Sequence, residues 1–146
     1  MRSQIFAGLA LGLAAVAAAA PMESRASDEQ VTIDSAVFVR NDSNNNDNWD
    51  TITNAGLTLS TASGSVRCDA DSFPDPSIPS KVYTCADSAY SFQISSRPGY
   101  DLYAITITHK VSDSVTLTGT ANVGCNGPIP KSCFQVSSRQ ATLTAA

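Results

Sequence analysis

His109 is the only histidine of the chain, so any Ser-His-Asp mechanism must use it as the general base. Asp113 could orient its ring and Ser112 is close by, but neighbours along one strand do not form a triad. His109 alternates with Ile107 and Val111 and therefore points toward the apolar face of its strand. We interpret it as a partly buried strand histidine and predict that the chain has no catalytic residue.

A run of polar side chains places oxygen ligands at alternate positions, which is the spacing of a calcium-binding loop. Its members are Asp42, Asn44, Asn46, Asn48 and Asp50. The sixth position holds Asp47 where such a loop needs glycine, and the twelfth holds Thr53 where it needs a bidentate glutamate. Zinc would need Cys-x-x-Cys or clustered histidines, and the sequence has neither. We therefore predict a solvated loop, with no metal and no cofactor.

Two pairs of carboxylates are candidates for glycosidase chemistry: Asp69 with Asp71, and Asp75 with Asp87. Both pairs lie in or beside the segment between the first two cysteines, where a fixed separation is difficult to hold. The sequence also has no glycine-rich phosphate loop. These observations favour a protein that is not an enzyme, with a hydrolase of unusual type as the catalytic alternative.

Four cysteines, Cys68, Cys85, Cys125 and Cys133, follow an N-terminal export signal, and disulfides are the default for such a chain. Four cysteines allow three connectivities. Sequential pairing would close two short loops, each contributing roughly 2–3 kcal/mol by the chain-entropy model. The last two cysteines flank an Asn-Gly pair and two prolines, a composition typical of turns.

The export signal begins with the positive Met1-Arg2 and continues as an apolar stretch that small residues close at Ala20. This stretch is too short and too poorly flanked to be a membrane anchor, and no second hydrophobic span follows. We expect a secreted, extracellular protein. Its expected parts are a signal peptide at 1–19, a short pro-segment or flexible N-terminus at 20–30, and a single domain of about 120 residues at 31–146.

Apolar and polar side chains alternate along most of the domain, and this period of two is typical of half-buried antiparallel strands. The expected inward faces are Val31, Ile33, Val37 and Val39; Leu57 and Leu59; Tyr90, Phe92 and Ile94; Tyr103, Ile105, Ile107, His109 and Val111; Val115, Leu117, Gly119 and Ala121; and Phe134 and Val136, which open a last strand reaching Leu143. Turns are expected at 54–56, 97–99, 112–114 and 126–127. The predicted fold class is all-β, a compact antiparallel β-barrel or sandwich with two disulfides.

Two segments interrupt the strand pattern, Asn41–Asp50 and the proline-rich Phe73–Pro79. Both should be surface loops, which carry binding more often than strands do. Their candidate partner contacts are Trp49, Phe73 and Ile78, and the alternative for the last two is that they fold back over the barrel. Asn41 begins the sequon Asn-Asp-Ser and is a candidate glycosylation site, with an unoccupied sequon as the alternative.

The formal net charge is −4, and the basic residues are scattered rather than gathered in a stripe. Nucleic acid is therefore excluded as a partner, and so is charge-driven binding to anionic lipid.

Several short matches occur in a fixed order along the chain. They are Pro21-Met22-Glu23-Ser24-Arg25, Cys68 followed by Tyr83-Thr84-Cys85, Phe92, Lys110-Val111-Ser112-Asp113 before a Thr/Ala-rich strand, and Cys125 and Cys133 flanking Gly127-Pro128. This ordered set resembles the family of the major Alternaria allergen, secreted fungal β-barrel proteins that include elicitors of plant cell death.

The resemblance implies a compact β-barrel with sequential disulfides, Cys68–Cys85 and Cys125–Cys133. It also implies a secreted fungal elicitor or effector that binds a host plant defence protein or receptor and triggers defence or cell death. An alternative is an extracellular carrier of a small hydrophobic or phenolic ligand. Relatives that form a disulfide-linked dimer use an extra cysteine near the mature N-terminus, and this chain has none, so no such dimer is expected.

Overall fold

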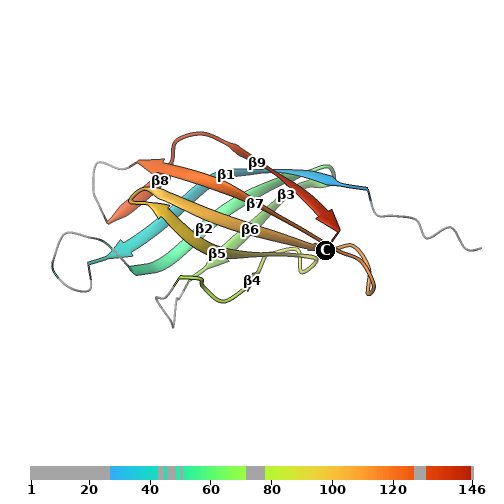
Figure 1. The fold of residues 1–146 in the computed structure, drawn as a ribbon, viewed down its shortest axis with the longest axis horizontal. Coiled ribbons are helices and arrows are strands. Elements are labelled where there is room, and N and C mark those ends of the chain that lie inside the picture. The colour runs from blue at the N-terminus through green and yellow to red at the C-terminus, as the bar shows by residue number, and fades with distance from the viewer. Residues whose placement is uncertain are drawn as a thin grey trace, which may run out of the picture.

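The computed structural model describes residues 27–42, 45, 49, 51–71, 78–126 and 131–145, and within them the chain forms nine strands (Figure 1). The strands are β1 (Glu29–Asn41), β2 (Thr51–Thr61), β3 (Gly64–Ala70), β4 (Tyr83–Thr84), β5 (Tyr90–Gly99), β6 (Leu102–Lys110), β7 (Thr116–Asn126), β8 (Ser132–Gln135) and β9 (Arg139–Ala145). No helix in this described part is long and apolar enough to cross a membrane. The all-β, antiparallel class is confirmed. The predicted signal peptide lies outside the described residues, and β1 begins within the segment 20–30 that was expected to precede the domain.

The sheet follows the order β3-β2-β1-β8-β7-β6-β5-β4 and curls around one core. Neighbouring strands β8 and β9 share the space between β1 and β7. The second half of β1 pairs with β8, where Phe38 lies opposite Cys133, and the first half pairs with β9, where Glu29 lies opposite Leu143. The predicted last strand is therefore two strands, each closing one end of the barrel.

A β-bulge in β1 reverses the inward face of that strand. Pairing with β2 slips between Asp34 and Val37, and Ser35 adopts a φ of 51° in the left-handed region. Before the bulge Val31 and Ile33 are buried, and after it the buried positions are Ala36, Phe38 and Arg40. The prediction that Val37 and Val39 share a face with Val31 is therefore wrong, because one extra residue inverts the alternation.

The Gln135 side chain bridges the gap that the bulge leaves between β1 and the β8–β9 connection. Its Oε1 accepts a hydrogen bond from the buried Ala36 amide at 2.8 Å. Its Nε2 donates to the carbonyls of Ile33 and Ser137, each at 2.8 Å. One amide side chain therefore replaces the missing ladder bonds at this point.

Replacing Gln135 with Ala should lower the free energy of unfolding by about 1–3 kcal/mol, because the buried Ala36 amide loses its acceptor. Gln140→Ala is the matched control, since Gln140 is exposed on β9 and its loss should change stability by about 0.5 kcal/mol or less. Urea unfolding followed by Trp49 fluorescence measures both. Equal stabilities of the two variants would contradict this role of Gln135.

Some residues that were predicted to point inward, and some predicted turns, also need correction. Cys133 is buried and points inward, so Phe134 points outward and is 49% exposed, as is Val136 at 68%. Val111 lies beyond the end of β6 and is exposed. The segment 54–56 lies within β2 and 97–99 within β5, so neither is a turn, whereas 112–114 does connect β6 to β7.

The two disulfides are sequential, as predicted. Cys68 on β3 is bonded to Cys85, just after β4, with 4.1 Å between their Cα atoms. Cys125 on β7 is bonded to Cys133 on β8, with a Cα separation of 5.3 Å. No cysteine remains free, so a disulfide-linked dimer is not available to this chain.

Candidate functional site

An ion pair with a buried arginine lies at the end of the barrel where β1 finishes. The side chain of Arg40 is 2% exposed, and its Nη1 donates to Asp101 Oδ1 at 2.7 Å and to the carbonyl of Tyr100 at 3.3 Å. Burial alone would lower the pKa of Arg40, but hydrogen bonds to Asp101 and Tyr103 outweigh it and raise that pKa. Arg40 points inward because the bulge at Ser35 has inverted the alternation of β1.

A second arginine and two tyrosines surround this pair. The guanidinium carbons of Arg40 and Arg97 each lie 5.1 Å from the centre of the Tyr100 ring, and that of Arg97 lies 5.5 Å from the Tyr103 ring. Arg97 also donates to the Tyr100 carbonyl from Nε at 3.0 Å and from Nη2 at 2.7 Å. We call Arg40, Arg97, Tyr100, Asp101 and Tyr103 the arginine–tyrosine cluster.

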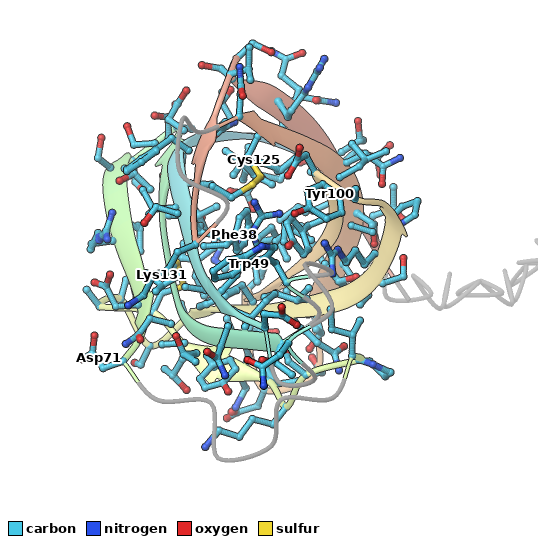
Figure 2. The ribbon with its side chains drawn as sticks, turned by 90° about the vertical axis from the view of Figure 1, so that its left-hand side faces the viewer. Phe38, Trp49, Asp71, Tyr100, Cys125 and Lys131 are labelled. Carbon is cyan, nitrogen blue, oxygen red and sulfur yellow. A yellow bond between two sulfur atoms is a disulfide. The ribbon has the colours of Figure 1, made fainter. Side chains whose placement is uncertain are left out.

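Trp49, one of the predicted partner contacts, is attached to this cluster. Its carbonyl accepts a hydrogen bond from Arg97 Nη1 at 3.0 Å, and its φ of 46° lies in the left-handed region, which is unusual for a tryptophan. Figure 2 looks into this end of the barrel, where the labelled Trp49 and Phe38 lie inside the ring of strands and Asp71 lies at its outside. Trp49 is half-buried, so part of it remains available for contact.

The other predicted surface residues have different surroundings. Asn41 is exposed at the end of β1, so its side chain is accessible at the sequon. Ile78 is half-buried and packs against the hydrophobic core, which is what the alternative of folding back over the barrel predicts. Phe73 lies outside the described residues. Glycosylation of Asn41 and partner contact by Trp49, Phe73 and Ile78 stay predictions.

His109 lies at the opposite end of the barrel and is partly buried, as the alternation of its strand predicted. Its Nδ1 contacts Glu29 Oε2, and its ring stacks on that of Tyr90 with 4.0 Å between the ring centres. The Tyr90 hydroxyl donates to the other oxygen of Glu29 at 2.7 Å. Asp113 does not orient His109 but accepts a hydrogen bond from Lys110 at 2.8 Å.

Burial, together with the hydrogen bond to Glu29, raises the pKa of Tyr90 to about 12. A raised pKa gives stability that is complete below the unfolded value of about 10 and is lost as the pH rises toward the folded value. Wild-type protein should therefore lose about 2 kcal/mol more unfolding free energy than Tyr90→Phe between pH 9 and 11.5. Chemical denaturation of both proteins across that range tests this. Parallel curves for wild type and Tyr90→Phe would refute it.

The remaining candidates for chemistry have structural partners or lie elsewhere. Asp69 is paired with Arg67, with 2.5 Å between its Oδ1 and Arg67 Nη2, and Asp87 accepts a hydrogen bond from the Ala89 amide at 2.9 Å. Asp71 is exposed. Asp75 and four members of the calcium-like run, Asn44, Asn46, Asn48 and Asp50, lie outside the described residues. The one group of metal-ligand types found in the described part is Asp101 with Cys125 and Cys133, whose sulfurs are bonded to each other and are not thiolates.

Two kinds of residue were missed by reasoning from the sequence. Arg40 and Glu29 take their partners, Asp101 and His109, from distant parts of the chain, so no local pattern signals them. Phe134 and Val136 were assigned to the core, although counting the alternation outward from Cys133 would have placed them on the surface.

The fold of the chain is that of two solved crystal structures of the Alternaria alternata allergen Alt a 1. The first matches with a TM-score of 0.57 and 20% identity, over 80% of this chain and 94% of the other. The second, at 22% identity, has a TM-score of 0.58 and covers 88% of this chain and 96% of the other. No curated protein sequence matches significantly. The family model described as Alternaria alternata allergen 1 matches residues 36–144, and the chain thus belongs to this allergen family.

Proposed function

We propose that this protein is a secreted fungal elicitor that acts by binding a host plant defence protein or receptor. The observation that carries the proposal is the use of the chain's only histidine, His109, in a structural contact with Glu29 and Tyr90. The carboxylates Asp69 and Asp101 likewise pair with arginines. A rigid scaffold whose reactive groups bond to one another is suited to recognition through its surface.

The end of the barrel that carries Trp49 is the surface we expect the partner to contact. Trp49 is half-buried and anchored by Arg97, while Tyr100 beside it is exposed. Tryptophan, tyrosine and arginine are the residues that most often carry binding energy in protein interfaces. A backbone held by a hydrogen bond, as at Trp49, also loses less entropy when a partner binds.

The direct test is capture of a plant apoplastic or plasma-membrane protein on the purified folded chain, followed by measurement of its affinity. Trp49→Ala should weaken that affinity at least about tenfold, as expected for an interface hot spot. Lys110→Ala, on an exposed side chain at the opposite end of the barrel, is the matched control and should leave it unchanged. Equal affinity of both variants would place the contact elsewhere. No saturable plant partner in any fraction would reject the proposal.

His109→Gln should leave the cell-death response unchanged per folded molecule, because binding needs no general base. Infiltration of plant leaves at matched concentrations of folded protein measures the response, with circular dichroism to verify folding. A folded His109→Gln variant without activity would favour the hydrolase instead.

A carrier of a small phenolic ligand is the second candidate, and the arginine–tyrosine cluster is the observation that favours it. Guanidinium groups stacked on Tyr100 and Tyr103 show that this end accepts planar aromatic neighbours. Phe38 and Tyr103 fill the barrel interior here, so a ligand would bind at the mouth or between subunits. Trp49 is the only tryptophan, and quenching of its fluorescence by a hydroxylated flavonoid probe would support this role. Unchanged fluorescence and no ligand bound on equilibrium dialysis would exclude it.

A further inference from the structure

Among the described residues, no hydrogen-bonded ladder joins β3 to β4, the two ends of the strand order. Strands β2 and β3 are paired from Ala55–Ala70 to Thr61–Gly64, and the path continues through paired strands to β4. Where β3 and β4 meet to close the barrel, the described residues contribute one backbone hydrogen bond, from the Ala86 amide to the Arg67 carbonyl at 2.7 Å. We call this boundary the seam.

The Cys68–Cys85 disulfide crosses the seam next to that single hydrogen bond. Apart from that hydrogen bond and the disulfide, the backbone hydrogen bonds of the described residues hold each side of the seam to its own neighbouring strand. The β4 side is held by β5, through hydrogen bonds from the Cys85 amide to the Tyr90 carbonyl at 3.0 Å and from the Ser80 amide to the Ile94 carbonyl at 2.9 Å. The β3 side is held by the ladder with β2. Without the covalent bond, the two sides can separate while each keeps its own ladder.

The second disulfide has a different relation to the sheet. Cys125 and Cys133 join β7 to β8, which already pair directly through Cys125 with Gln135 and Asn126 with Phe134. Strand β8 is also paired with β1. Breaking this disulfide would therefore leave its two strands held by hydrogen bonds.

We propose that the Cys68–Cys85 disulfide is a redox-controlled clasp, and that a dithiol reductant opens the barrel along the seam. A thiolate of the reductant attacks the sulfur of Cys85, which is 7% exposed against 0% for Cys68, and releases the Cys68 thiolate. The second thiol of the reductant then attacks the mixed disulfide and releases the Cys85 thiolate. The protein gains two electrons and, on protonation, two thiol protons, and the reductant leaves as its own disulfide.

Opening the seam would expose apolar surface that the closed barrel buries. The inward side chains of β3 are Val66, Cys68 and Ala70, all buried in the closed form. On the other side, Tyr83 stacks on Phe92 with 5.5 Å between ring centres and packs against the core. The reduced protein would present this surface and two unpaired strand edges, which other chains can bind. The clasp does not depend on the proposed recognition of a host protein.

Hydrogen exchange with and without dithiothreitol, in native buffer, tests the clasp. The variant Cys125→Ala/Cys133→Ala keeps the seam disulfide alone, and alkylation with mass analysis verifies its reduction. Exchange in β3 and in residues 80–86 should then accelerate by about tenfold or more, while β6 and β7 stay protected. The matched variant Cys68→Ala/Cys85→Ala should show fast exchange at the seam even without reductant, with no further change there when its remaining disulfide is reduced.

Three results would overturn the proposal: unchanged protection of β3 after verified reduction, loss of protection across all strands together, or reduction that occurs only in denaturant. If either variant fails to fold, wild-type protein gives the same readout under partial reduction, with each disulfide quantified separately. Return of β3 protection after reoxidation would support a reversible clasp. Failure to recover protection would show irreversible damage and overturn it.

Discussion

Asp101→Ala should lower the free energy of unfolding by about 1.5–3 kcal/mol, the range for a hydrogen bond to a charged group. Its partner Arg40 is 2% exposed, whereas Asp101 itself is 43% exposed, so the variant removes a carboxylate hydrogen bond from a cation that stays inside the barrel. Because water reaches the exposed Asp101 side of the pair, we expect the loss of unfolding free energy to lie toward the lower end of that range.

The matched control is Asp113→Ala. Asp113 is paired with Lys110 at 2.8 Å between two exposed side chains, and surface pairs contribute about 0–1 kcal/mol. Guanidinium chloride unfolding of the wild type, Asp101→Ala and Asp113→Ala, analysed with a common m-value, separates the two effects. If Asp101→Ala and Asp113→Ala are equally stable, Arg40 finds another partner and the cluster is not held together by its charges.

Gly119→Ala should destabilise the barrel by at least about 3 kcal/mol or prevent folding. A Cβ at Gly119 would collide with the backbone carbonyl oxygen of Thr142, and would lie 2.8 Å from the Thr142 carbonyl carbon and 2.9 Å from Leu143 Cδ2. These atoms belong to β9, whose backbone is fixed by its ladder with β1. The clash therefore cannot be relieved by rotating a side chain.

Gly124→Ala on the same strand is the control for the loss of a glycine. Its Cβ would meet only Leu102 Cδ1, at the ordinary contact distance of 3.8 Å. We expect a change within about 1 kcal/mol, and of either sign. Thermal unfolding and soluble yield of both variants are the measurements. A stable, soluble Gly119→Ala protein would show that β9 can move away from β7.

The alternation of side chains predicted much of this fold because it reports which face of a strand is buried. The predicted inward residues of β2, β5 and β6 are buried as expected: Leu57 and Leu59; Tyr90, Phe92 and Ile94; and Tyr103, Ile105 and Ile107. The prediction failed in β1, where Ser35 takes a left-handed φ that nothing in its residue type requires. After that point every inward residue of the strand was assigned to the wrong face.

The candidate site was less predictable than the fold, since its contacts join residues far apart in the sequence. Trp49 was recognised as a lone aromatic in a polar loop, but its attachment to Arg97 depends on how β2 and β5 are brought together. Glu29 and His109 meet only because the sheet brings the start of β1 and the end of β6 to the same end of the barrel. Periodicity describes one strand at a time and carries no information on such pairs.

The pairing of β1 with β8 and β9 has a consequence for biogenesis. Glu29 finds its ladder partner at Leu143, and Phe38 finds its partner at Cys133, so the first strand of the barrel is completed only by the last two. Contacts of such long sequence separation form slowly and carry a large loop-closure entropy. A nascent chain that has not yet released residues 132–145 therefore cannot complete β1, so closure of the barrel follows synthesis of almost the whole chain.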